Sequence, residues 1–422
     1  MVLKRQYPYY VTNINGKKMF GSIFVFLIAG VTIWLTQKYK EIAWAIAIAF
    51  IFRISAALIN LYVVTLPDGG VDATGFEYFS WAWGKDGLIV AYSHFFEKGL
   101  PWTYSNVGSL FYAIFGRDPL ILQSISVIAG VYCVVLVWKL SIQVWGSQSF
   151  AKTSAWLVAI YPILILYSSL TMREVFITLL ITYGLLHVIL WSQTIKIKHA
   201  FIALMAFSLQ ILLHPGMAMG GVLFIGLLFL YNLKLVYTSL TNNSRLDAQS
   251  ILIIIVCLSC GLYIYTFATS LTFPYYSWLN MDNLILRASL MYNGDAAYPS
   301  WLIADTPIQF MLLAVPKLFY FLFSPFPWDI SKFKHIIGFL DGVVYLILFI
   351  SIFSYSKYIK SNPRALILLL FLIFLSILFS IAVGNFGTGL RHRSKLLPII
   401  IILASPIIYQ LFFFMKKKLN LE

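Results

Sequence analysis

Apolar stretches long enough to cross a bilayer recur along this chain from residue 20 to residue 414, and no polar segment of domain size separates them. A helix needs about 20 apolar residues to span the hydrocarbon core. Such stretches must be helical there, because the backbone has to satisfy its hydrogen bonds without water. The sequence therefore predicts an all-α, polytopic transmembrane bundle, in which residues 1–422 form a single transmembrane domain.

The low share of charged residues also indicates a membrane protein. Charged residues make up 11% of the chain, whereas soluble domains carry about 25%. The net charge is +15, but basic residues of membrane proteins collect in cytoplasmic loops and attract anionic lipid or phosphate-bearing substrates. We therefore expect membrane lipid, and no nucleic acid, as a partner.

Basic segments also set the expected orientation, because Lys and Arg favour the cytoplasmic side. These segments are 193–199, 232–247, 356–364 and 416–422. About 11 spans alternate consistently with them when two apolar segments, 101–115 and 308–324, are not counted as full spans. The result is a long external loop with interfacial helices, 66–118, and a second external region with a re-entrant or interfacial helix, 267–334.

Acids gather just beyond a span, in "LPDGGVDATGFEYFSWAW". Asp72 is the first candidate for catalysis, because a carboxylate at the membrane surface can act as general base toward an acceptor hydroxyl. Asp68 and Glu77 are alternative acids in the same segment. The competing interpretation is structural: "PDGG" is then an ordinary turn, and Asp72 caps the next helix.

Two further external turns carry ionisable residues. "SLTMREVF" places Arg173 and Glu174 between two spans, and "LLHPGM" places His214 in a tight turn. Glu174 is a second acid candidate, although the helix dipole also favours an acid at a helix N-terminus. His214 is a candidate for substrate binding, or a hydrogen-bonded structural residue.

The second external region supplies aromatic residues beside cations, with Arg287, Tyr298 and Trp328 as substrate-binding candidates. Aromatic rings pack against sugar faces, and cations hold phosphate oxygens. Anchoring at the bilayer interface is the alternative explanation for each aromatic residue.

The segment "GNFGTGLRHRSKLLPI" places cations between two apolar stretches, on the face that positive charge normally avoids. Its three glycines allow the backbone to approach a ligand. We interpret Arg391, Arg393 and Lys395 as donor-phosphate ligands, with His392 as a further substrate-binding candidate. The alternative is contact with phospholipid headgroups.

Together these residues resemble the GT-C superfamily of polyprenyl-phosphate-dependent glycosyltransferases, which includes protein O-mannosyltransferases and lipid A aminoarabinose transferases. The resemblance covers roughly 42–266, through "VDATGFEYFSWAW", "GLPWTYSNVGSLFYAIFG" and "AWLVAIYPILILYSSLTMREVFITLL", and extends to "RHRSKLLP". It implies that Asp72 is the catalytic base, that Arg173 and Glu174 lie beside the active site, and that the late arginines bind the donor phosphate. Relatives often have adjacent paired acids, whereas Asp68 and Asp72 are four positions apart.

The expected activity is that of an inverting glycosyltransferase with an undecaprenyl-phosphate- or undecaprenyl-diphosphate-linked donor. It would work at the periplasmic face of a bacterial inner membrane, in O-antigen or capsule biosynthesis, by single-sugar transfer or, as in O-antigen polymerases, repeat-unit polymerisation. Its partners would be lipid-linked sugars and a chain-length regulator or other polysaccharide assembly proteins.

No cofactor is required; a divalent cation between Asp72 and Glu174 is possible, but no ligand spacing indicates a metal. The alternatives are a flippase or exporter of lipid-linked oligosaccharide and a membrane scaffold.

The orientation is testable with a topology reporter fused at Gly294, in the second external region. We expect the signal of a periplasmic reporter, and that of a cytoplasmic reporter from a control fusion at Asn362. The reverse pattern would place the candidate residues on the wrong side of the membrane.

Overall fold

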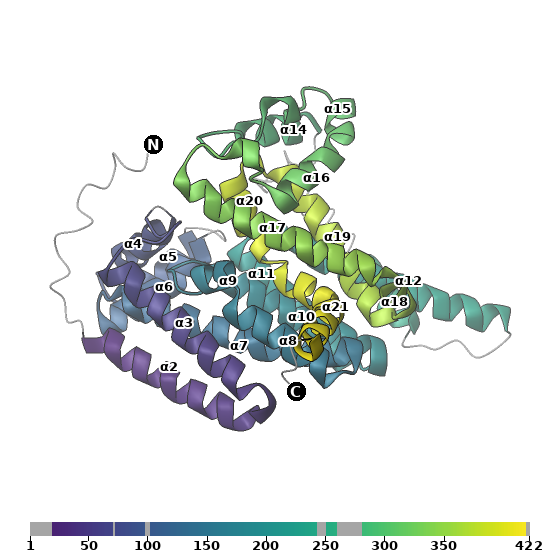
Figure 1. The fold of residues 1–422 in the computed structure, drawn as a ribbon, viewed down its shortest axis with the longest axis horizontal. Helices are drawn as coiled ribbons and strands as arrows, with labels where there is room; N and C mark the ends of the chain where they lie inside the picture. The colour runs from purple at the N-terminus through teal and green to yellow at the C-terminus, as the bar shows by residue number, and fades with distance from the viewer. Residues whose placement is uncertain (1–18, 71, 98–101, 243–249, 260–280, 419–422) are drawn as a thin grey trace. The chain divides into compact units, whose positions relative to one another are not determined.

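The computed structural model describes residues 19–70, 72–97, 102–242, 250–259 and 281–418, and nearly all of them are helical (Figure 1). Within these ranges no β-strand occurs; two residues, Ala297 and Asn385, form an isolated bridge. The predicted all-α class is therefore confirmed.

Eight of the described helices are long and apolar enough to cross a membrane. Many of their side chains are both apolar and exposed; Phe26 and Phe353, for example, are 77% and 72% exposed. Apolar surface of this extent is unfavourable in water and typical of helices that face lipid. The eight segments are Phe20–Lys38, Lys40–Tyr62, Pro119–Trp145, Glu174–Thr194, Pro215–Thr241, His335–Ser354, Pro363–Ala382 and Leu397–Phe414.

The other three expected spans are not among these eight helices. The segment near 200–213 is α11 (Ile197–Leu213), of 17 residues. The segment near 250–266 lies partly outside the described residues, which show a helix over Ser250–Ser259. The segment near 153–170 is divided into α8 (Gln148–Ile160) and α9 (Pro162–Tyr167).

Pro162 explains this division, because proline has no N–H to donate to the carbonyl four residues earlier. Arg53, on α3 (Ala43–Tyr62), supplies the missing donors: its Nη2 donates to Val158 O at 3.0 Å and its Nη1 to Ala159 O at 2.9 Å. Arg53 is 1% exposed and has no carboxylate partner among the described residues. This charge inside a span therefore satisfies a broken helix end, whose dipole favours a cation.

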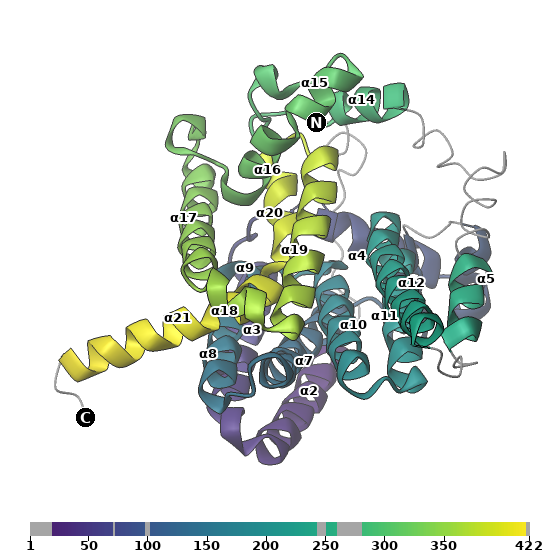
Figure 2. The same cartoon turned by 90° about the vertical axis from the view of Figure 1, so that its right-hand side faces the viewer.

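The chain divides into two compact units. Unit 1 comprises Met1–Gly216, Leu346–Leu369 and Ser394–Glu422, and unit 2 comprises Met217–Tyr345 and Leu370–Arg393. In unit 1, α3, α8 and α10 (Glu174–Thr194) pack around α7 (Pro119–Trp145), the most deeply buried span (Figure 2). The single transmembrane domain expected for residues 1–422 stays a prediction.

The segment 66–118, predicted to be an external loop, contains three helices too short to cross a bilayer: α4 (Asp72–Gly84), α5 (Leu88–Glu97) and α6 (Thr103–Phe115). Glycines allow α4 and α6 to pack closely. A Cβ at Gly84 would collide with Ser109 O, and one at Gly108 would collide with the Ser80 side chain. This packing holds α4 beside the ends of the spans.

The remaining helices complete the two units. Unit 1 also contains α2 (Met19–Lys38), α18 (Ser356–Ser361) and α21 (Leu397–Lys418). Unit 2 contains α12 (Ala218–Thr241), α14 (Met281–Leu290), α15 (Pro307–Leu312), α16 (Ala314–Phe323), most of α17 (Phe333–Ser354), most of α19 (Pro363–Ala382) and most of α20 (Phe386–Ser394). The short α15 and α16 occupy the apolar segment that was expected not to be a full span, and α16 ends just before Pro325.

We predict that Arg53→Met lowers the stability of the protein by a few kcal/mol, about 1–3 for each stranded carbonyl. In a Pro162→Ala background residue 162 regains an N–H for Val158 O, so the same substitution should cost about 1–2 kcal/mol less. Reversible unfolding in mixed detergent micelles measures all four proteins of this double-mutant cycle. If the effects of the two substitutions on the free energy of unfolding were strictly additive, Arg53 would not be satisfying the carbonyl that Pro162 leaves without a donor.

Candidate functional site

Asp68 and Asp72, in the segment predicted to be an external loop, lie just before and at the start of α4 in unit 1. Asp72 is half-buried in the first turn of α4, a position consistent with both the catalytic and the capping interpretation. Asp68, in the preceding turn, has a φ of 60°. Its carboxylate accepts a hydrogen bond from the Tyr167 hydroxyl at 2.9 Å, which fixes the loop against the end of α9.

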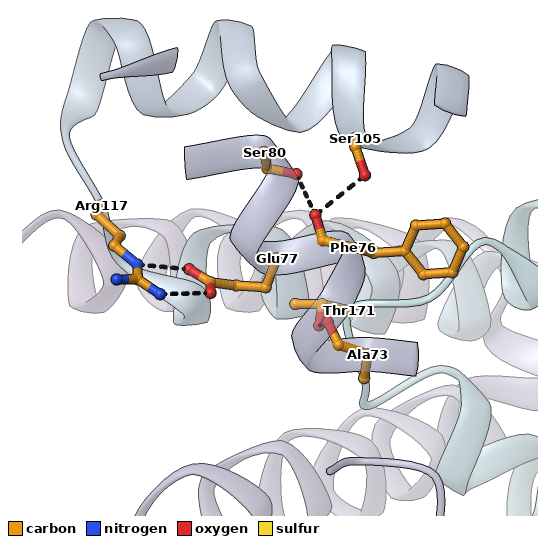
Figure 3. A network of polar contacts seen from close by, with 7 residues as sticks. All are labelled: Ala73, Phe76, Glu77, Ser80, Ser105, Arg117 and Thr171. Atoms are coloured by element: carbon orange, nitrogen blue, oxygen red, sulfur yellow. Dashed lines mark hydrogen bonds and ion pairs between the residues drawn. The ribbon is translucent and has the colours of Figure 1, made fainter. Parts of the chain in front are cut away.

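The turn between α9 and α10 holds the same loop through its backbone. Thr171 Oγ1 donates to Ala73 O at 2.7 Å (Figure 3). Ser169 Oγ donates to Arg53 O at 2.9 Å, so the turn is also tied to α3. Because Ala73 adjoins Asp72 and Thr171 precedes Arg173, these contacts bring two predicted site segments together.

Arg173 joins this region to the end of α11. Its Nη1 donates to Leu213 O at 2.8 Å, next to His214, and its guanidinium carbon lies 5.3 Å from the Phe76 ring centroid. A cation over an aromatic face is attracted by the ring. Asp68, Asp72, Arg173 and His214 are thus gathered at one end of unit 1.

Glu174 begins α10 and is buried beside Lys395. Glu174 Oε1 lies 4.0 Å from Lys395 Nζ, and the two side chains are 2% and 0% exposed. Glu174 Oε2 has no hydrogen-bond partner within the part of the chain that the structure describes. Burying a charge is costly unless it is paired, so this carboxylate and ammonium depend on each other, and one oxygen is left to accept a further donor.

Tyr104 of α6 adds a protonated phenol to this buried region. Its pKa is raised, mainly by burial; the Ser126 hydroxyl opposes this rise, and the carboxylates of Glu174 and Glu77 add to it. The group is therefore a neutral hydrogen-bond donor at any physiological pH. Sequence reasoning missed Tyr104, because only the fold places it near both acids.

Glu77, the third acid predicted for the site in this segment, is engaged in an ion pair. Arg117 donates from Nε to Glu77 Oε1 at 2.9 Å and from Nη2 to Oε2 at 2.8 Å (Figure 3). This two-bond geometry is strong and directional, and the Arg117 guanidinium also lies over the Trp81 ring. The pair connects α4 to the end of α6, and the catalytic role considered for Glu77 stays a prediction.

The late arginines belong to unit 2, where Arg393 is fully buried. Its Nε and Nη2 donate to Asp341 Oδ2 at 3.1 and 2.6 Å, and its Nη1 donates to Leu322 O and Ser324 O. Burial, the largest single effect, lowers the pKa of Arg393, but the Asp341 carboxylate together with Tyr345 and Tyr298 raises it, so the net shift is upward. Sequence reasoning missed Asp341, although an acid inside an apolar span is itself a signal.

Packing within unit 2 explains the glycines of "GNFGTG". Gly384 approaches Met291 and Tyr292 so closely that a Cβ would lie 2.7 Å from backbone and ring atoms, and a Cβ at Gly389 would lie 2.9 Å from the Tyr298 hydroxyl. Asn385 Oδ1 accepts from Thr388 N at 2.8 Å and so caps α20. Arg391 and His392 are half-buried on this helix. Binding of donor phosphate by Arg391 and Arg393, and of substrate by His392, stays a prediction.

The aromatic candidates of unit 2 surround Tyr320. Tyr298 is buried, with its ring centroid 5.4 Å from that of Tyr320. Trp328 is 73% exposed, stacks on Phe326 at 5.0 Å, and donates from Nε1 to the Tyr320 hydroxyl at 3.3 Å. Arg287 is half-buried on α14. An exposed tryptophan whose orientation is fixed by such contacts is suited to packing against a sugar face or to lying at the bilayer interface.

The chain was compared with protein-family models, curated proteins and solved structures, and nothing matches it. Within the described residues, no group of three or more His, Cys, Asp or Glu side chains is placed to hold a metal ion. The GT-C resemblance therefore rests on the sequence patterns alone.

We predict that Glu77→Gln destabilises the protein by about 1.5–3 kcal/mol, because it weakens two charge-assisted hydrogen bonds at a buried carboxylate. Glu41→Gln is the matched control, since Glu41 pairs with Lys152 where both side chains are about half exposed. That pair should contribute less than about 1 kcal/mol. Unfolding in mixed micelles measures both variants; equal losses would show that Glu77 has no structural role beyond that of a surface acid.

Proposed function

We propose that the protein is an inverting membrane glycosyltransferase whose donor is a sugar linked to a polyprenyl phosphate or diphosphate. One observation carries the proposal: an acid-bearing external loop is tied to the α9–α10 turn, next to Arg173 and to the buried pair Glu174–Lys395. A base for an acceptor and cations for a leaving phosphate are the two requirements of this transfer.

In the proposed reaction the Asp72 carboxylate takes the proton of an acceptor hydroxyl. The acceptor oxygen forms a bond to the anomeric carbon of the donor sugar from the face opposite the phosphate. The bond from that carbon to the phosphate oxygen breaks, and its electron pair stays on the oxygen. The products are a glycoside of inverted configuration and the free polyprenyl phosphate or diphosphate.

Arg173 and Lys395 are the proposed cations for the departing phosphate. Lys395 is fully buried and paired with Glu174, and a charge interaction is stronger where water is excluded. One preorganised group aimed at developing charge typically contributes about 3–4 kcal/mol to the transition state. Asp68, held by Tyr167, would orient the loop that carries Asp72, and His214 would contact substrate beside Arg173.

The proposed setting is the periplasmic face of a bacterial inner membrane, in O-antigen or capsule biosynthesis. Eight apolar helices support a membrane location, and the basic segments support an outward-facing Asp72. The substrate would be a single lipid-linked sugar or a lipid-linked repeat unit, and a chain-length regulator or another polysaccharide assembly protein would be its partner.

We predict that Asp72→Asn abolishes complementation of a surface-polysaccharide defect in a deletion strain of the source bacterium. Loss of a general base lowers the rate by about 10²–10⁴-fold. Asp86→Asn is the matched control, because Asp86 is an exposed acid of the same external loop. Both variants should insert at wild-type levels, and wild-type glycan from Asp72→Asn would rule out this mechanism.

Membranes that contain the protein distinguish transfer from transport. A glycosyltransferase releases free polyprenyl phosphate or diphosphate from the lipid-linked sugars in proportion to glycan formed, whereas a flippase moves the donor intact. Loss of this release in Asp72→Asn supports transfer, and glycan export without release supports the flippase.

A further inference from the structure

A cavity lies in unit 1, between α7 and α10. It has a volume of about 520 Å³, within the range of small-molecule sites, about 300–1,000 Å³. Polar side chains line part of it, including Lys139, Gln143, Tyr183 and His187, and leucines and an isoleucine line the rest. A mixed lining of this kind suits a ligand with a polar head and an apolar body.

The charge of this lining is positive. Lys139 lies over the Tyr39 ring, 5.0 Å from its centroid, and forms no ion pair with a carboxylate of the described residues. No Asp or Glu lines the cavity. Arg364 donates from Nη1 to Gln143 O at 2.7 Å, which places a second cation beside the lining. An anionic group is the ligand that these charges favour.

A histidine pair holds α10 to α11 at the same level. His187 Nδ1 and His199 Nδ1 are 2.9 Å apart, so one ring donates and the other accepts. The accepting ring, when neutral, carries its proton on Nε2 and can donate from there. In the tautomer in which His199 donates and His187 accepts, the His187 Nε2–H can donate to a ligand beside Lys139.

The depth of the cavity in the membrane follows from the helix ends. Lys139 and His187 each lie about 10 Å from the ends of α7 and α10, at a rise of 1.5 Å per residue. Lys196 and Lys198 follow α10 directly. Glu174 begins the same helix, about 20 Å from His187 along its axis. The cavity thus lies in the half of α10 opposite the acids of segment 66–118, about 10 Å inside the helix ends, a depth from which the Lys139 side chain can reach toward the headgroups.

We propose that this cavity binds the phosphate headgroup of an anionic phospholipid from the leaflet in which α7 and α10 end. Lys139 and His187 contact the phosphate, and the acyl chains extend from there along α7 and α10 toward the centre of the bilayer. This site is independent of the proposed glycosyltransferase activity.

Native mass spectrometry of the full-length protein tests the proposal, with phosphatidylglycerol and phosphatidylcholine supplied in equal amounts in a neutral detergent. Wild-type protein should retain one phosphatidylglycerol about tenfold more tightly than phosphatidylcholine, the size expected of one charge-assisted contact. Lys139→Met should remove this preference and His187→Gln should reduce it. Lys152→Met is the control, because Lys152 is a half-exposed lysine outside the cavity.

Two results would overturn the proposal. Equal retention of the two lipids by wild-type protein would show only an unspecific lipid annulus. Displacement of phosphatidylglycerol by millimolar inorganic phosphate, with equal thermal stabilisation by phosphate alone, would identify a soluble phosphate ligand. Because the wild-type comparison needs no substitution, the test holds even if a variant fails to fold.

Discussion

The requirement that a backbone satisfy its own hydrogen bonds in lipid determines how unit 1 is built. Pro162 breaks a span, and Arg53 repairs the break by donating to two carbonyls. The broken span then ends in the turn at 168–173, which carries Thr171 and Arg173. Without these two hydrogen bonds the turn would not be held in place against the segment that carries Asp72. A charged residue in the membrane thus supports the candidate site without belonging to it.

Three fully buried cations, Arg53, Arg393 and Lys395, have different contacts. Arg53 satisfies backbone carbonyls, Arg393 neutralises Asp341 and also holds two carbonyls, and Lys395 is buried beside a carboxylate that keeps one oxygen for another donor. Intramembrane charge is expensive, and each of these residues has a compensating contact. The Glu174–Lys395 pair is distinct, because it adjoins the loop that carries Asp72.

Sequence reasoning reached the helical membrane class because hydropathy reports directly on transfer into lipid. The expected number of about 11 spans stays a prediction; eight long apolar helices occur among the described residues, and composition did not show that Pro162 divides the segment near 153–170. Site segments far apart in the sequence, at 68–77, 171–174 and 213–214, were identified from their polarity. The pairing of Glu77 with Arg117 and of Arg393 with Asp341 was missed, because pairing depends on which helices become neighbours.

The contact between Glu174 and Lys395 joins residues separated by more than half of the chain. During synthesis, Glu174 is inserted long before Lys395 emerges from the ribosome, and until then its carboxylate has no ammonium beside it. The arrangement around Glu174 is therefore completed only when the segment that carries Lys395 has been inserted. A chain interrupted before residue 395 would hold the buried Glu174 carboxylate without this ammonium beside it.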